Sequence, residues 1–135
     1  MFDMDGTLVS TLSTFLHCLN EISLRYKKES LGLEDIVPKF GPPAMVIVRG
    51  LTGALPEDLQ NRAISDFYDC WKKNARDKVI VFPGIQSLLQ DIRSSGKRLG
   101  LVTGIEKVMM ESTPQALRVG QVFRDTNTSG RCPDR

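Results

Sequence analysis

Asp3 and Asp5 are the residues of this chain whose spacing most directly indicates chemistry. They stand two positions apart in the segment Phe2-Asp3-Met4-Asp5-Gly6-Thr7-Leu8, and residues i and i+2 of an extended segment point to the same side. Gly6 allows the backbone to turn tightly and to approach a ligand. Two crowded carboxylates repel each other unless a cation or a shared proton relieves them, and Mg²⁺ prefers carboxylate oxygens. The pattern therefore indicates either a magnesium site with a nucleophilic aspartate or a simple Asx/Gly turn with solvated acids.

A second polar element, Thr103-Gly104, follows the apolar run Leu99-Gly100-Leu101-Val102, which predicts a buried strand. Ligands bind at the carboxyl ends of the strands in parallel sheets, so Thr103 stands where a ligand would bind. The helix expected from about Glu106 would also point backbone N–H groups toward an anion. Thr103 could equally cap that helix, and both interpretations stay open.

The segment 11–76, between these two motifs, is predicted to be helical. Apolar residues at helical spacing predict a helix over 11–28. Pro56 opens a second strong helix, because proline suits the first helical position and two acidic residues follow it. A short helix is expected at 33–37, and the apolar run 44–51 fits either a helix or a strand.

The remainder of the chain alternates strands with helices. Strands are predicted at 79–82 and 99–102, with a helix from Ile85 to Gly96 between them. This order predicts an α/β fold, a parallel sheet with right-handed crossovers. The later elements are expected to be a helix from about Glu106, a kink or restart at Pro114, a strand beginning at Val122-Phe123 and a loop over 127–135.

Length and composition fit one soluble domain. The net charge of +2 over 135 residues is too small to indicate binding to nucleic acid or to a membrane surface, and no signal peptide or spanning segment is apparent. Cys18, Cys70 and Cys132 show no C-x-x-C spacing, which favours reduced thiols in a cytoplasmic protein over a disulfide or a zinc site. His17 has no ligand partner near it in the sequence, so we expect it to serve packing.

The segment Phe2–Leu8 resembles the first motif of the haloacid dehalogenase (HAD) superfamily, most of whose members are Mg²⁺-dependent phosphatases. The resemblance implies that Asp3 is the nucleophile, that Asp5 is the general acid/base, and that both bind Mg²⁺. Dehalogenases lack an acid at the second position, so Asp5 favours phosphoryl chemistry. The run Leu101-Val102-Thr103-Gly104 resembles the second motif, which implies phosphate binding at Thr103 and Gly104.

The order of elements resembles a HAD enzyme with a Rossmann-like core and a small inserted helical cap. The core would comprise residues 1–10 and 79–135, and the cap residues 11–78. Gly41-Pro42-Pro43 and Phe82-Pro83-Gly84-Ile85 are similar to phosphoglycolate-phosphatase-like members. The resemblance implies hydrolysis of a small phosphate monoester through an aspartyl-phosphate. The expected partner is a small phosphorylated metabolite, with no nucleic acid and no membrane, and the chain is expected to be a monomer or homodimer.

Two later HAD motifs, a basic residue and a downstream acidic pair, are not recognisable. Arg131 or Arg135 could supply the missing cation, although arginine is not equivalent to lysine. Arg49 in the cap could reach an anionic substrate or be a surface residue. The pattern indicates a chain trimmed at both ends, for which we expect weak Mg²⁺ binding and little turnover. The alternatives are a phosphomutase, a non-catalytic protein, and a phosphonoacetaldehyde hydrolase, whose Schiff-base lysine the segment after 41–43 lacks before Lys72.

Overall fold

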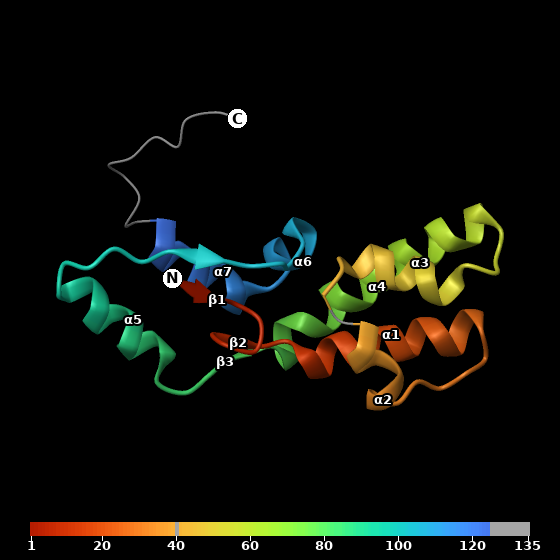
Figure 1. Ribbon diagram of the computed structural model, residues 1–135, viewed down its shortest axis with the longest axis horizontal. Helices are drawn as coiled ribbons and strands as arrows, with labels where there is room; N and C mark the ends of the chain where they lie inside the picture. Colours follow the sequence, from red (N-terminus) through yellow and green to blue (C-terminus); the bar gives the residue numbers. More distant parts are fainter. Residues whose placement is uncertain (40, 125–135) are drawn as a thin grey trace.

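The computed structural model describes residues 1–39 and 41–124 and places them in two adjoining lobes (Figure 1). One lobe, the core, is built from segments near both ends of this range and contains the N-terminus. The other lobe, the cap, is the helical segment between them. A helical insertion between two parts of an α/β unit is the arrangement that the order of elements predicted.

The cap consists of helices whose bounds follow the apolar periodicity of the sequence. The two long helices α1 (Leu12–Tyr26) and α4 (Glu57–Lys78) pack along each other, and α3 (Ala44–Thr52) packs on α4. Pro56 precedes α4 with a φ of −53°, which suits the start of a helix. The predicted helices are confirmed, and the ambiguous run 44–51 is helical. The short connecting elements are α2 (Leu33–Ile36) and the 3₁₀ helix η1 (Val37–Lys39).

Large apolar side chains fill the space between the cap helices. Phe67 and Trp71 of α4 are buried, and the ring of Phe15 on α1 meets them edge-on at centroid distances of 5.5 and 6.5 Å. Leu19 and Ile22 continue the buried face of α1 at helical spacing. Burial of one such side chain contributes about 1.5–3 kcal/mol, so packing between its own helices stabilises the cap.

The core contains a pair of parallel strands, β1 (Phe2–Asp3) and β4 (Leu101–Val102). Phe2 lies opposite Leu101, so the residues that follow both strands meet at one edge. The helix α5 (Ile85–Ser94) leads toward β4, and Gly96 after it has a φ of 74°, a conformation that suits a helix end. The predicted α/β class and the parallel pairing of the strand at 99–102 are confirmed.

Two helices, α6 (Lys107–Glu111) and α7 (Pro114–Arg124), follow β4, and the helix restarts at Pro114 as predicted. The expectation of a strand beginning at Val122-Phe123 is wrong. Buried residues of α7 recur at helical spacing up to Phe123, and this pattern outweighs the strand preference of two residues. The Phe123 ring meets the Phe2 ring edge-on at 6.0 Å, so α7 packs against β1.

The chain passes from core to cap through β2 (Val9–Ser10) and returns through β3 (Ile80–Val81). These strands pair antiparallel, with Val9 opposite Val81, which corrects the expectation that the strand at 79–82 joins a parallel sheet. An insertion that leaves and re-enters at one place brings its two connections together in opposite directions. The predicted domain boundaries at residues 10 and 79 lie in this pair or next to it.

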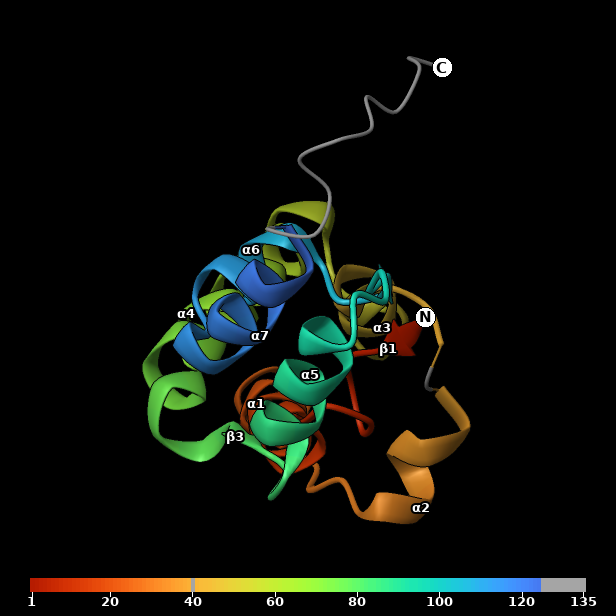
Figure 2. The same ribbon diagram turned by 90° about the vertical axis from the view of Figure 1, so that its left-hand side faces the viewer.

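A view from the core end shows α5 in front, with α7 beside it and the cap helices behind (Figure 2). The two lobes therefore lie end to end, with the antiparallel pair β2–β3 where they join. Within residues 1–39 and 41–124, no helix combines the length and the apolar character that crossing a membrane requires.

Candidate active site

A tight turn holds Asp3 and Asp5 at the carboxyl end of β1. Asp3 Oδ1 accepts a hydrogen bond from the Met4 N–H at 2.8 Å, and the Met4 side chain between the two acids is fully buried. Gly6 has a φ of +71°, a left-handed conformation that favours glycine, and its N–H donates to the Val9 carbonyl at 2.9 Å. Both carboxylates line the same cavity, as the i, i+2 spacing predicted.

Thr103, which follows β4, lies across the strand pair from Asp5. Its hydroxyl is 3.5 Å from Asp5 Oδ2 and accepts a hydrogen bond from the Ile105 N–H at 3.1 Å. The hydroxyl thus closes a local turn and also faces the acid, while α6 begins only later in the chain. Gly104 lines the cavity beside the two acids. The structure therefore brings four of the predicted site residues together.

The two acids occupy different environments. Burial raises the pKa of the Asp5 carboxyl, and the charge of Asp3 adds to this effect. Hydrogen bonds with Thr11 and Thr103 act in the opposite direction without cancelling the rise. Asp3 is exposed to solvent. A proton is therefore held on Asp5 at higher pH than on an ordinary aspartate, which is what a general acid requires.

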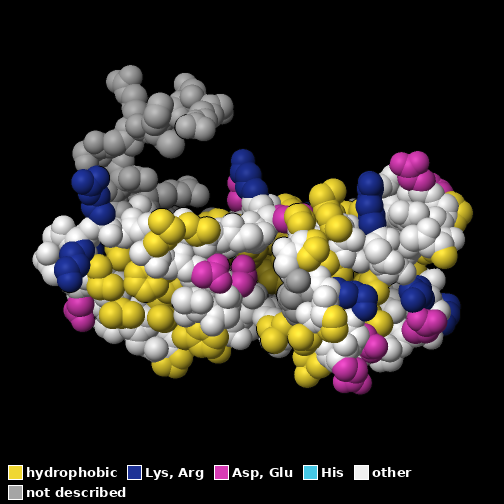
Figure 3. All heavy atoms as spheres, in the orientation of Figure 1, with side chains coloured by type: hydrophobic (Ala, Val, Ile, Leu, Met, Phe, Trp, Pro, Cys, Tyr) yellow, Lys and Arg dark blue, Asp and Glu magenta, His cyan; other side chains and the backbone are white. Residues whose placement is uncertain are grey.

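A cavity of about 540 Å³ between core and cap contains both acids. Figure 3 shows a recess between the lobes with hydrophobic side chains on its walls, and Phe15 and Trp71 of the cap line the cavity. Of the described residues that line it, Asp3, Asp5 and Glu106 are acidic and none is lysine or arginine. A phosphate anion would therefore need an added cation to bind beside these acids.

Glu106, which sequence reasoning did not select as a site residue, links the core to the cap beside the cavity. Its carboxylate accepts hydrogen bonds from the Ala44 N–H at the start of α3, at 3.1 Å, and from the Tyr68 hydroxyl of α4, at 2.9 Å. Burial raises the pKa of Tyr68, and the Glu106 carboxylate raises it further. An acid two positions after Gly104, where the chain leaves the predicted strand, was the sequence signal that could have found it.

Trp71 forms a second connection between the lobes. Its indole N–H donates to the Met109 carbonyl and to the Thr113 hydroxyl, both at 3.1 Å. The sequence placed Trp71 on the apolar face of a helix, which is correct, but the pattern gives no sign of the hydrogen bonds. The same side chain therefore packs the cap, lines the cavity and contacts the core.

Other predicted residues lie elsewhere. Arg49 is exposed on α3, outside the cavity lining, and donates to Asn61 Oδ1 at 3.2 Å. Lys72 is exposed on α4, so it does not supply the lysine that a Schiff base would need among the described residues lining the cavity. Arg131, predicted to bind phosphate, and Arg135, its alternative, both lie outside the described residues.

The sequence is similar to proteins that are named as phosphatases. The sequence profile of a family described as haloacid dehalogenase-like hydrolase matches residues 1–129. A phosphoglycolate phosphatase from Pseudomonas putida is 26% identical over 130 residues, which cover 92% of this chain and 47% of the relative. The pyrophosphatase PpaX from Bacillus mycoides is 25% identical over 91% of this chain and 55% of its own length. The chain spans about half the length of the curated relatives it matches.

The fold also has a counterpart among solved structures. The crystal structure of a predicted phosphoglycolate phosphatase from Haemophilus somnus matches with a TM-score of 0.72 and 18% identity, covering 86% of this chain and 57% of that one. At this identity the likeness establishes the fold. The match of the family profile confirms the resemblance that the first motif indicated. This chain belongs to the haloacid dehalogenase-like hydrolase family.

Proposed function

We propose that this site hydrolyses a small phosphate monoester, with Mg²⁺ as cofactor and Asp3 as nucleophile. The observation that carries the proposal is the meeting of Asp3, Asp5 and Thr103 at one strand edge, beside a cavity between core and cap. Relatives named phosphoglycolate phosphatase support a small phosphorylated metabolite as substrate. The Gly41-Pro42-Pro43 turn, which resembles that group of proteins, lines the same cavity.

The donor set in the cavity fits Mg²⁺. Asp3 and Asp5 offer carboxylate oxygens side by side, and the charge of Asp3 disfavours ionisation of Asp5 when no cation relieves it. Bound there, Mg²⁺ would offset the negative charge of this acidic pair and polarise the phosphate oxygens. Since no lysine or arginine is found among the described residues that line the cavity, a phosphate depends on such a cation.

The two acids divide the work of the reaction. Asp3 attacks the phosphorus and forms an aspartyl-phosphate, while Asp5 gives its proton to the leaving oxygen of the ester. Asp5 then takes a proton from a water molecule whose oxygen attacks the phosphorus, which releases phosphate and restores Asp3. The Thr103 hydroxyl and the Gly104 backbone hold the phosphoryl oxygens in place. The raised pKa of Asp5 suits a group that first donates and then accepts a proton.

The cap would position the substrate and restrict water. Phe15 and Trp71 give the cavity an apolar part of its wall, and its volume suits a small substrate. We place the activity in the reducing cytoplasm, because Cys18 and Cys70 are both free thiols. The chain would act as a monomer or homodimer on a soluble metabolite, with no nucleic acid or membrane as partner.

Hydrolysis of p-nitrophenyl phosphate and of phosphoglycolate, with and without Mg²⁺, tests the proposal. We expect slow hydrolysis that requires Mg²⁺, is lost with a chelator and returns when Mg²⁺ is restored. Asp3→Asn should reduce the rate to background, because the amide is a poor nucleophile. Low turnover is expected because the described residues lining the cavity include no cation for the phosphoryl group.

The matched control is Asp69→Asn, since Asp69 is an exposed acid on α4 outside the cavity lining. This variant should hydrolyse both esters at the rate of the parent chain. Hydrolysis that persists in Asp3→Asn would remove Asp3 from the reaction and sink the proposal. Fast Mg²⁺-dependent hydrolysis that Asp3→Asn abolishes would support the chemistry and contradict the expected low turnover.

A further inference from the structure

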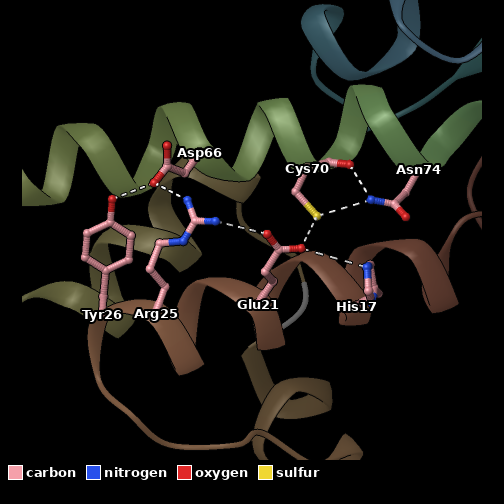
Figure 4. Close-up of polar contacts among 7 residues, drawn as sticks. All are labelled: His17, Glu21, Arg25, Tyr26, Asp66, Cys70 and Asn74. Carbon is pink, nitrogen blue, oxygen red and sulfur yellow. Dashed lines mark hydrogen bonds and ion pairs between the residues drawn. The ribbon is translucent and has the colours of Figure 1, made fainter.

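Three side chains of the kinds that bind transition metals meet on the cap, away from the candidate active site (Figure 4). His17 and Glu21 lie one turn apart on α1, and Cys70 faces them from α4. Glu21 Oε2 is 3.9 Å from His17 Nε2 and 3.3 Å from Cys70 Sγ. One ligand atom from each residue lies within 4.8 Å of the other two.

We propose that His17, Glu21 and Cys70 form a binding site for Zn²⁺ or a similar divalent transition-metal ion. The proposal is independent of the phosphatase function, because none of the three residues lines the cavity that holds Asp3 and Asp5. Imidazole, carboxylate and thiolate are the ligand types that zinc takes in proteins, and hard cations such as Mg²⁺ do not select the sulfur.

The spacing of the ligand atoms suits a tetrahedral ion. With zinc bonds of about 2.0 Å to nitrogen or oxygen and about 2.3 Å to sulfur, ligand atoms stand roughly 3.3–3.8 Å apart. The distances from Glu21 Oε2 to His17 and to Cys70 are already close to this range. Small rotations of these side chains would therefore suffice for coordination.

Residues around the three ligands already orient them. Glu21 directs Oε1 to Arg25 at 3.3 Å, which leaves Oε2 for His17 and Cys70, and Arg25 is in turn held by Asp66 at 2.8 Å. Partners of this kind fix ligand orientation in metal sites. Arg25 and Asp66 both lie on the cap helices α1 and α4, as the ligands do.

Asn74 supports the sulfur from the other side. Its amide group donates to the Cys70 carbonyl at 2.8 Å and lies 3.5 Å from Cys70 Sγ, so it holds this end of the site in place. The ligands are accessible from solvent, because the His17 and Glu21 side chains are 46% and 43% exposed. Solvent can therefore occupy a fourth coordination position, as in zinc sites with three protein ligands.

Binding of one metal ion would release one proton, that of the Cys70 thiol. In the metal-free site the Cys70 thiol donates to Glu21 Oε2. On binding, the sulfur loses this proton to solvent and both atoms turn to the metal. This site could not be recognised from sequence, because Glu21 and Cys70 stand 49 positions apart on two helices. The expectation that His17 serves packing is wrong, because its side chain is 46% exposed. The proposal also replaces the expectation that the cysteines do not form a zinc site.

Titration of the chain with Co²⁺ in oxygen-free buffer tests the site, because Co²⁺ replaces zinc and reports its ligands by absorption. We expect one equivalent of Co²⁺ to produce a sulfur-to-metal charge-transfer band and the visible bands of a tetrahedral ion, and Zn²⁺ to remove them. Cys70→Ser should abolish the charge-transfer band. His17→Gln should weaken binding by at least about 10-fold while leaving the fold intact, since His17 is exposed.

The matched control Glu29→Gln should bind Co²⁺ like the parent chain, because it removes an exposed acid that pairs with Lys27 outside the proposed site. Circular dichroism checks that every variant is folded. A charge-transfer band that survives Cys70→Ser, Co²⁺ affinity unchanged by His17→Gln, or no band at millimolar Co²⁺ would each overturn the proposal.

Discussion

The cap and the core place their carboxylates in opposite environments. In the cap, Asp66 accepts hydrogen bonds from the Tyr26 hydroxyl at 2.7 Å and from Arg25 at 2.8 Å (Figure 4). In the core, Asp5 is partly buried beside a second carboxylate, Asp3, and its hydrogen-bond partners are threonine hydroxyls. The cap acid Asp66 therefore stabilises the fold, whereas the core acid Asp5 costs stability when ionised and is available for chemistry.

The lobes also differ in packing. In the cap, α1 and α4 pack along each other with Phe67 and Trp71 buried between the helices. In the core, β1 and β4 have two residues each, and Leu89 is the buried residue of α5. We infer that the cap is the better-packed part of this chain, while the core presents the candidate active site.

The largest effect should come from breaking the packing of the cap. Phe67→Ala should lower the free energy of unfolding by about 3–5 kcal/mol, because it leaves a cavity under an aromatic ring. Leu89→Ala in α5 should cost less, about 2 kcal/mol, because its helix is otherwise little buried. Urea unfolding followed by circular dichroism measures both.

Leu24→Ala is the control for this pair, because Leu24 is 45% exposed on α1, and it should change stability by less than about 0.5 kcal/mol. A greater loss from Leu89→Ala than from Phe67→Ala would reverse the comparison between the lobes.

A smaller loss is expected from Asp66→Asn. Burial alone would raise the pKa of Asp66, but hydrogen bonds from Tyr26 and Arg25 outweigh it and hold that pKa below its usual value. The contribution of Asp66 to the stability of the fold is therefore present above its unfolded pKa and is lost as pH falls through its folded pKa. Asp66→Asn should cost about 1–2 kcal/mol at neutral pH and almost nothing in acid, measured by thermal unfolding across that range.

Asp69→Asn on the same helix is the matched control, because the Asp69 side chain is 68% exposed. Its thermal stability should follow the parent chain at every pH. A cost of Asp66→Asn that stays constant from neutral to acid pH would mean that the ionised carboxylate is not what stabilises the cap.

The link between the lobes can be loosened at Glu106. Glu106→Gln should cost about 1 kcal/mol, because the amide is a weaker acceptor for the Ala44 N–H and the Tyr68 hydroxyl. Burial and Glu106 raise the pKa of Tyr68. The contribution of Tyr68 to the stability of the fold is therefore complete below the unfolded pKa and is lost as pH rises through the folded pKa. The substitution should lower the pKa of Tyr68, measured by tyrosinate absorbance.

Tyr26 provides the internal reference for that titration. Burial raises its pKa too, with Asp66 as the neighbouring acid, and Glu106 is not among its partners. Tyr26 should therefore titrate alike in parent and variant. If neither the Tyr26 nor the Tyr68 titration curve differs between the parent chain and Glu106→Gln, then Glu106 does not hold Tyr68 across the interface.

Local patterns allowed most elements to be predicted from sequence. The helices at 11–28 and after Pro56 follow from apolar periodicity, and the Asp3/Asp5 turn follows from residue spacing and Gly6. The strand expected at Val122-Phe123 failed because two residues carry too little signal against a helical period.

Contacts between distant segments were not predictable in the same way. The antiparallel pairing of β2 with β3, the contacts of Glu106 with the cap and the meeting of His17 with Cys70 all depend on how the lobes and helices dock. Periodicity gives the buried face of a helix but not its partner. Such contacts need the three-dimensional structure.

The smallest expected effect is a gain in stability, from Asp5→Asn, and it tests the contrast between the core and cap acids most directly. Burial raises the pKa of Asp5, with the charge of Asp3 adding to it, so the stability this group contributes is present below its unfolded pKa and lost as pH rises through the folded pKa. The ionised Asp5 therefore costs stability at neutral pH. Asp5→Asn should stabilise the chain by about 0.5–1 kcal/mol there, a gain typical of relieving a functional site.

Thermal unfolding of Asp5→Asn from neutral to acid pH separates this account from a simple loss of contacts. The gain in stability from Asp5→Asn should shrink in acid, where Asp5 is protonated in the parent chain. The loss in stability from Asp66→Asn should also shrink in acid, so the two variants approach the parent chain from opposite sides. Mg²⁺ should narrow the difference in stability at neutral pH, because a cation bound beside Asp3 and Asp5 stabilises the parent chain more than the variant, which keeps only Asp3. If Asp5→Asn lowers the unfolding temperature at neutral pH, the core acid stabilises the fold as the cap acid does, and the contrast between the lobes fails.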